Sequence, residues 1–108
     1  MTTTIEFRSY DVKGIRVVAP SGEIDAATCA QLAEQLTAPP GSRLVVDLDQ
    51  VTFLDSSGLG TLHRARQRAL EVGGDLVVTR PTPFVFRVLE ITGLDAWVRE
   101  WEPRWTPQ

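Results

Sequence analysis

The sequence predicts a single α/β domain whose small, mixed and mostly parallel β-sheet is packed against helices. Short apolar runs of strand length alternate along the chain with segments whose apolar residues recur at helical spacing. The run RLVVDLD at 43–49 is almost continuously apolar, as is typical of a parallel strand buried on both faces. A chain of 108 residues is long enough for one hydrophobic core and too short for two.

The first elements expected are a β-hairpin and a helix. Alternating residues at 5–7, a turn at 11–14 and an apolar strand at 15–19 predict the hairpin, and the PSG triplet at 20–22 is expected to end its second strand. Asp25 is a candidate N-cap for the helix that follows. The apolar face of that helix is expected to contain Ala26, Cys29, Leu32, Ala33 and Leu36.

The centre of the chain is expected to hold a strand and the main helix. After the strand at 43–49, a short connector, VTFL, leads into a helix over 57–72, and the glycine pair 73–74 is a strong C-terminal stop. The apolar side of this helix is expected to contain Leu59, Leu62, Ala65, Ala69 and Leu70.

The last elements expected are a strand at 75–79, a helix at 84–91 and a final short strand at 97–101. Thr82 and Pro83 are well suited to the N-cap and the first turn of that helix, and Gly93 is suited to close it.

Composition and charge argue against several classes of protein. A net charge of −3 argues against a nucleic-acid binder, which normally carries a basic excess. The single cysteine, Cys29, cannot form an internal disulfide and is expected to pack in the core. The N-terminus does not resemble a signal peptide, and no apolar run reaches the length of roughly 20 residues that a membrane helix needs. We therefore expect a cytoplasmic protein with no membrane contact, no metal and no cofactor, folding as a monomer or weak dimer.

The segment with the most distinctive chemistry is FLDSSGLGTL, residues 53–62, at the carboxyl end of a strand and the start of a helix. Free amides at a helix N-terminus favour an anion, so either a capping serine or a phosphoserine is accommodated there. Gly58 and Gly60 each cost roughly 1 kcal/mol in a helix relative to alanine. Two interpretations remain open: Ser56 or Ser57 caps the helix while the glycines allow close packing, or the bare first turn lets a partner approach the serines.

Four segments resemble the anti-sigma-factor antagonists, which are bacterial STAS-domain proteins. The resemblance extends over residues 4–101, the predicted STAS domain, and leaves 102–108 as a loose C-terminal tail. The four segments, in the expected order, are SGEID at 21–25, FLDSSGLGTL at 53–62, EVGGDLVV at 71–78 and VLEITGLDAWV at 88–98.

The resemblance implies a partner-switching regulator. The unmodified antagonist binds an anti-sigma factor, which is also a serine kinase, and so releases a sigma factor. The kinase then phosphorylates the serine directly after the motif aspartate, here Ser56, and a metal-dependent phosphatase of the PP2C type removes the phosphate. The residues implied at the partner surface are Asp55, Ser57, Gly58, Leu59, Gly60, Gly22, Glu23 and Asp25, although Asp25 is equally suited to a plain capping role, and Asp55 to that of a helix-start acid.

Several other residues invite a structural or a functional interpretation. His63 and Arg66 lie beside the apolar side of the main helix, where they either flank the core or form a partner-facing edge. Trp97 is expected in the core. Trp101 and Trp105 are candidates for an exposed patch that serves self-association or a partner.

Competing functions are less well supported by the sequence. His63 lies about two helical turns from Ser56, which is poor geometry for a Ser-His dyad, and no nucleophile elbow or phosphate loop is present, so no catalysis is expected. Asp47 and Asp49 end a strand as in a two-component receiver, but the only lysine is Lys13, far from the late position that a receiver needs. The alternative is a STAS accessory subunit, for instance of a membrane transporter, that works without phosphorylation.

Overall fold

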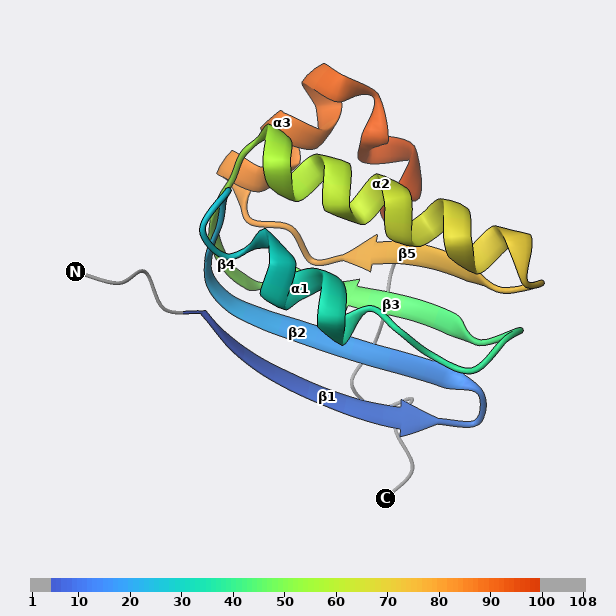
Figure 1. The fold of residues 1–108 in the computed structure, drawn as a ribbon. Coiled ribbons are helices and arrows are strands. Elements are labelled where there is room, and N and C mark those ends of the chain that lie inside the picture. Colours follow the sequence, from blue (N-terminus) through green and yellow to red (C-terminus); the bar gives the residue numbers. More distant parts are fainter. Residues whose placement is uncertain (1–4, 100–108) are drawn as a thin grey trace.

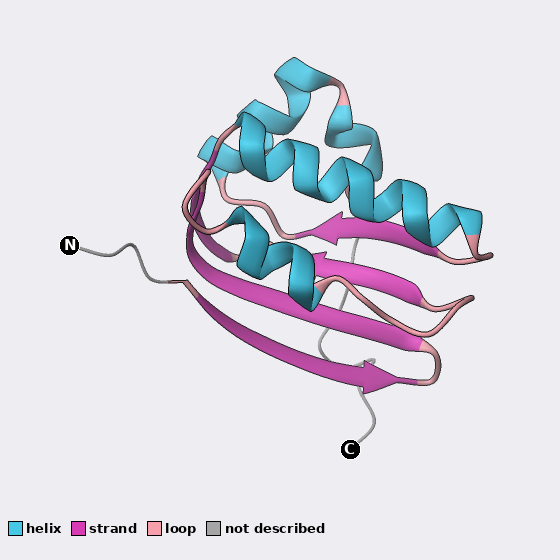
Figure 2. Ribbon diagram, in the orientation of Figure 1, coloured by secondary structure: helices cyan, strands magenta, loops and turns pink. Residues whose placement is uncertain are grey.

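The computed structural model describes residues 5–99 and places the helices on one face of a five-stranded sheet (Figure 1, Figure 2). The predicted α/β class is therefore confirmed. The elements in chain order are β1 (Glu6–Val12), β2 (Ile15–Ile24), α1 (Cys29–Gln35), β3 (Arg43–Asp47), β4 (Gln50–Leu54), α2 (Ser56–Glu71), β5 (Asp75–Thr79), α3 (Pro83–Thr92) and the short 3-10 helix η1 (Leu94–Trp97).

The sheet is organised around β2. Its partner on one edge is β1, in the antiparallel hairpin that the sequence predicts, and the turn residues Lys13 and Gly14 both have positive φ, at 48° and 81°. Such a pair of angles matches the right-handed twist of the strands that the turn joins. On its other edge β2 pairs in parallel first with β3 and then with β4, while β5 extends the sheet beyond β3.

The prediction that the triplet 20–22 ends the second strand is wrong, because β2 continues to Ile24. The physical reason lies in the partner strands. Val18 is the last residue of β2 that pairs with β3, and Ser21 is the first that pairs with β4. Pro20 falls between them, so on that edge its missing N–H removes no ladder hydrogen bond.

The segment expected to be a connector, VTFL, is part of a strand. Within β4, Val51 and Leu54 are buried, Thr52 is exposed and Phe53 is half-buried. The strand pairs in parallel with the second half of β2, in a register that sets Leu54 opposite Ile24. The five-residue strand β4 therefore ends directly before the start of α2.

The main core lies between the sheet and the helices, and its larger fully buried residues include Ile24, Leu32, Leu48, Leu54, Leu62, Leu76 and Leu89. Helix α2 buries Gly58, Thr61, Leu62, Ala65 and Ala69 against this core. The placement of Leu70 on the buried side is wrong, since its side chain is 48% exposed. At 100° per residue, Leu70 is turned away from the buried line that ends at Ala69.

Helix α1 begins later than its apolar pattern suggests. It starts at Cys29, and Ala26 lies exposed in the turn before it. Cys29 is half-buried, and its thiol lies 3.7 Å from the carbonyl oxygen of Ala26. Cys29 therefore does not belong to the buried core in which it was predicted to pack.

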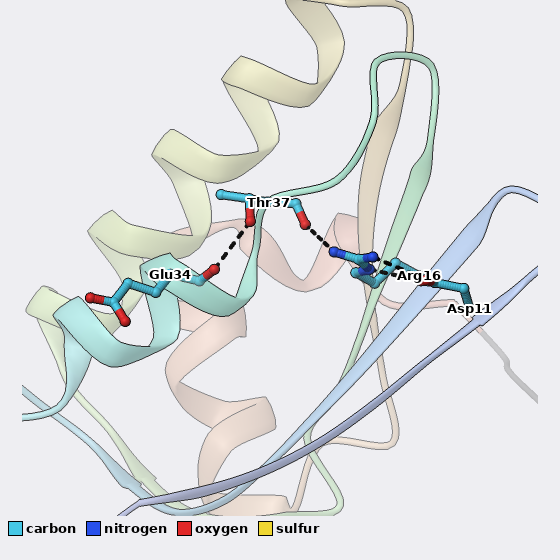
Figure 3. Close-up of polar contacts among 4 residues, drawn as sticks. All are labelled: Asp11, Arg16, Glu34 and Thr37. Carbon is cyan, nitrogen blue, oxygen red and sulfur yellow. Dashed lines mark hydrogen bonds and ion pairs between the residues drawn. The ribbon is translucent and has the colours of Figure 1, made fainter.

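Arg16 of β2 links the segment just after α1 to the β1–β2 hairpin through hydrogen bonds (Figure 3). Its Nε and Nη2 donate to the two carboxylate oxygens of Asp11 at 2.7 and 3.0 Å, and its Nη1 donates to the Thr37 carbonyl at 2.6 Å. The Thr37 hydroxyl in turn donates to the carbonyl of Glu34 at 3.2 Å. The hydrogen bond from Arg16 lowers the pKa of Asp11, so the pair favours the ionised carboxylate.

The last helix follows the prediction and the last strand does not. The Thr82 hydroxyl accepts from the Val85 amide at 3.4 Å, and Gly93 ends α3 with φ at 79°. After η1 the described chain forms only a single parallel bridge, between Val98 and Val78, in place of the expected strand at 97–101. Trp101, Trp105 and the tail 102–108 lie outside the described residues. Across 5–99, no helix is both long and apolar enough to span a bilayer.

Candidate functional site

The pairing of β2 with β4 brings the two predicted site segments together. Their carboxyl ends lie side by side, with Ile24 opposite Leu54, and the Asp55 amide donates to the Ile24 carbonyl at 3.2 Å. The segment 22–25 and the start of α2 are about thirty residues apart in sequence, yet they form one edge of the molecule. This edge is the carboxyl side of parallel strands, where α/β domains usually place their functional loops.

Asp55, and not a serine, caps α2. Its Oδ1 accepts hydrogen bonds from the amides of Ser57 and Gly58, at 2.9 and 3.2 Å, and its backbone is extended. An aspartate in this position satisfies amides that the helix leaves free. The hypothesis that Ser56 or Ser57 is the N-cap is therefore wrong, and neither hydroxyl is needed to begin the helix.

Ser56 and Ser57 differ in accessibility. Ser56 is the first residue of α2 and is exposed, whereas Ser57 is half-buried. The Ser57 carbonyl accepts a hydrogen bond from the buried hydroxyl of Thr61 at 2.9 Å, which ties that residue into the helix. Ser56 is thus the serine of the pair that a macromolecule can reach more easily.

Gly58 and Gly60 differ in how much space surrounds them. A Cβ at buried Gly58 would lie 2.5 Å from Leu54 Cδ1 and 2.7 Å from Ile24 Cγ2, closer than packed carbons approach. A Cβ at half-buried Gly60 would meet only the mobile end of Arg64, at 3.1 Å. The packing interpretation therefore holds for Gly58, which lets α2 lie against the ends of β2 and β4. It does not hold for Gly60.

The segment 22–25 is built from the end of β2 and a tight turn, rather than from a loop alone. Gly22 has φ at 123°, and a β-bulge separates it from Glu23, which is exposed. A non-glycine residue rarely adopts such a φ. The bulge shifts the register of β2 against β4 just before the two strands reach the site.

Asp25 and Thr28 lock this turn reciprocally. The Asp25 carboxylate accepts from the Thr28 amide at 3.2 Å, and the Thr28 hydroxyl accepts from the Asp25 amide at 3.0 Å. The same hydroxyl donates to the Glu23 carbonyl at 2.8 Å. Asp25 therefore caps this turn, whereas the N-cap position of α1 is Thr28, so the expectation that Asp25 is the N-cap of the helix is wrong. Sequence reasoning missed the fully buried Thr28, although its spacing from Asp25 is that of a capping box.

Trp97 lies where the core meets solvent, away from these loops. It is 9% exposed, as predicted for a core residue. The His63 ring stacks on it at 5.9 Å, and the Arg66 guanidinium lies 5.0 Å from its ring centre. Arg66 Nε also donates to the Leu76 carbonyl at 3.2 Å. His63 and Arg66 thus flank the core, which confirms the first of their two interpretations.

The acidic residues elsewhere serve the fold. Asp47 forms an ion pair with Arg80, with Nη2 and Oδ2 2.6 Å apart, and this contact raises the pKa of the guanidinium. Within residues 5–99, histidine, cysteine and carboxylate side chains form no group of three that could hold a metal ion. The edge formed by residues 22–25 and 55–60 presents the exposed residues Glu23 and Ser56.

Comparison with known proteins finds a domain family and several named relatives to which the chain is similar. Residues 10–100 match the family model described as "Mlab, STAS domain". An anti-sigma-B factor antagonist of Listeria monocytogenes is 34% identical over 97 residues, covering 87% of this chain and 84% of the relative. An anti-sigma F factor antagonist of Paenibacillus polymyxa is 31% identical over 98 residues, covering 87% and 82%. The crystal structure of an anti-sigma factor antagonist from Mycobacterium paratuberculosis superposes with a TM-score of 0.79 at 30% identity, covering 94% and 91%.

Proposed function

The chain belongs to the STAS domain family, and from this premise we propose that it is an anti-sigma factor antagonist controlled by phosphorylation of Ser56. Relatives that share about a third of its sequence carry the name of antagonists, which are regulators rather than enzymes. The observation that carries the proposal is the exposed Ser56 at the first position of a helix already capped by Asp55. Its hydroxyl is free for modification because the fold does not use it as the cap.

In the proposed cycle the unmodified protein binds an anti-sigma factor and thereby releases a sigma factor. The anti-sigma factor is also the serine kinase that modifies Ser56, and a PP2C-type phosphatase reverses the modification. The binding surface comprises the start of α2 and the neighbouring end of β2. Its residues are Asp55, Ser57, Leu59, Gly60, Gly22, Glu23 and Asp25, with Gly58 contributing its backbone.

A phosphate at Ser56 acts on binding rather than on the fold. It adds about −1.5 to −2 charges at neutral pH. The helix N-terminus favours this anion by roughly 0.3–1 kcal/mol, and the first turn of α2 carries no acidic side chain. The like charge of the Asp55 cap opposes the phosphate. The partner, in contrast, must bury a strongly hydrated dianion at the centre of the contact, which costs several kcal/mol without a cation to receive it.

The test is phosphorylation by a serine-kinase anti-sigma factor that binds this protein. Wild type, Ser56→Ala and Ser57→Ala are incubated with kinase and ATP, and intact mass and phosphopeptide mapping follow the phosphate. We expect wild type to gain one phosphate, Ser56→Ala none, and Ser57→Ala one at a reduced rate. A phosphate on Ser57 or Thr61 would refute the site. Tight binding to the kinase without any phosphate incorporation would favour an accessory STAS subunit that works without this switch.

A further inference from the structure

Arg64 extends its positive charge back along α2, toward the start of the helix. The residue is exposed and follows Gly60 by one helical turn. The three atoms nearest to a Cβ placed at Gly60 all belong to the Arg64 guanidinium: Nη1 at 3.1 Å, and Cζ and Nη2 at 3.8 Å. The charged head, and not the alkyl stem, therefore lies beside Gly60. This direction is the usual one, because side chains on a helix lean toward its N-terminus.

Gly60 leaves room for this head because it has no side chain. A larger residue would occupy the space beside the helix in which the guanidinium lies. Glycine also lowers the stability of a helix relative to alanine, and the core does not require it at this half-buried position. The head of Arg64 is thus the described group whose placement depends on a glycine here.

The charge of Arg64 has no counter-ion among residues 5–99. The three ion pairs in that part of the chain are formed by other arginines. The first turn of α2 contributes no acidic side chain either. A guanidinium presents five N–H donors in a planar fork, so this head can still bind an anion.

The place for that anion is Ser56, one turn before Gly60. Residues four apart are neighbours on a helix surface, with Cβ atoms roughly 5–6 Å apart. A phosphate on the exposed Ser56 hydroxyl would extend from its Cβ into the region that the Arg64 head already approaches. Arginine also matches phosphate in geometry, because two parallel N–H groups can donate to two oxygens.

We propose that Arg64 receives the phosphate of phosphorylated Ser56 within the same chain. The inference rests on the proposed modification of Ser56 and adds the residue that holds the modified side chain along the surface of α2. The contact forms only after modification, because the serine hydroxyl carries no charge. Gly60 then serves to keep the path between Arg64 and Ser56 open.

The test is phosphorus NMR of the full chain with phosphoserine installed at position 56 during translation, which requires no kinase. A cation beside the phosphate favours the dianion and lowers its second pKa. We expect this pKa to be about 0.3–0.7 lower in the otherwise unsubstituted phosphoprotein than in Arg64→Gln. Arg64→Lys keeps the charge without the planar fork and should retain part of the difference.

Two further variants show whether the effect is a local contact. Arg68→Gln, a matched change one turn further from Ser56, should leave the phosphate pKa near that of the unsubstituted phosphoprotein. Gly60→Leu fills the space of the guanidinium and should raise the phosphate pKa, as Arg64→Gln does. The other titratable groups around the helix start are the same in every form and cancel from the comparison; they are Glu23, Asp25, Asp55 and His63.

Three results would overturn the inference. The first is the same phosphate pKa with and without Arg64. The second is an equal change in Arg68→Gln, which would reflect the overall charge of α2. The third is an unchanged pKa in Gly60→Leu. A kinase that leaves Ser56 unmodified would refute the proposed function alone, because these spectra use a phosphate that is already installed.

Discussion

The amide of Asp55 donates a hydrogen bond to the carbonyl of Ile24, across 3.2 Å, and thereby joins the end of β2 to the start of α2. The same residue caps the helix through its side chain. Backbone and carboxylate together fix where α2 begins and which serine lies first in it. The position of Ser56 is therefore determined by a strand that lies about thirty residues earlier in the sequence.

Removal of the cap should weaken the fold. We expect Asp55→Ala to lower the free energy of unfolding by about 0.5–2 kcal/mol, because the amides of Ser57 and Gly58 lose their acceptor. Asp55→Asn should keep most of the stability, since asparagine caps equally well. Urea denaturation of the three proteins measures the difference. Equal stability of wild type and Asp55→Ala would show that the cap is not needed.

The Asp55→Asn variant also separates the capping role of Asp55 from any role of its carboxylate in recognition by the kinase. Asp55→Asn removes the charge and keeps the cap. If the kinase reads the carboxylate, phosphorylation of Ser56 should slow in Asp55→Asn while its melting temperature stays near that of wild type. An unchanged rate in this variant would restrict Asp55 to capping.

The two glycines should respond in opposite ways to alanine. We expect Gly58→Ala to destabilise the protein by about 1–3 kcal/mol, since the new methyl group overlaps Leu54 and Ile24. Gly60→Ala meets only the end of Arg64 and should raise stability by up to about 1 kcal/mol through helix propensity.

If Gly60 lies at the partner contact, the Gly60→Ala substitution should weaken binding to the anti-sigma factor even though it stabilises the fold. Calorimetric titration with the anti-sigma factor should then show weaker binding for Gly60→Ala despite its greater stability. Undiminished affinity of Gly60→Ala, or of a bulkier Gly60→Leu, would remove this residue from the proposed surface.

Phosphorylation of Ser56 should leave the free energy of unfolding within about 1 kcal/mol of the unmodified value, because the helix N-terminus and Asp55 act on the phosphate in opposite directions. Affinity for the anti-sigma factor should fall by orders of magnitude, since each 1.4 kcal/mol is tenfold. Ser56→Asp should reproduce part of this loss. Amide NMR shifts confined to the start of α2 are expected, and shifts spread across the sheet would contradict a local mechanism.

The contact between Asp11 and Arg16 should make stability depend on pH in acid. Arg16 holds the pKa of Asp11 below its ordinary value of 3.8. The stabilisation is complete above the pKa of the unfolded chain and is lost as the pH falls through the lower pKa of the folded state. The advantage of wild type over Asp11→Asn should therefore shrink in acid. Glu34→Gln, which removes another exposed carboxylate, is the control, and a constant difference would refute the linkage.

The sequence correctly predicted the turns and helix ends that are set by residues close together in the chain. The Lys13–Gly14 turn, the Thr82 cap and the Gly93 stop all depend on residues within a few positions of one another, and the structure has each of them. The continuation of β2 past Pro20 and the strand β4 were missed. Both depend on pairing between segments far apart in the chain, which periodicity does not report.

The candidate site was also predicted only in part from the sequence. The segment around Ser56 and the segment 22–25 were identified by resemblance, and their contact follows from the register of β2 with β4. The choice of Asp55 over a serine as cap was missed because all three residues favour that position. The core position of Gly58 could not be inferred either, since it depends on Leu54 and Ile24 approaching from other elements.

Because β2 pairs with both β3 and β4, residues cannot be inserted into β2 or deleted from it without disturbing the fold. One residue inserted or deleted between 19 and 24 would turn every following side chain of the strand to the opposite face. It would also shift Ile24 away from Asp55, and so displace the cap of α2. Gly41, in the loop before β3, is exposed and joins no ladder, so insertions there should be accepted easily. Engineered tags or fused domains therefore belong in that loop, and β2 must keep its length.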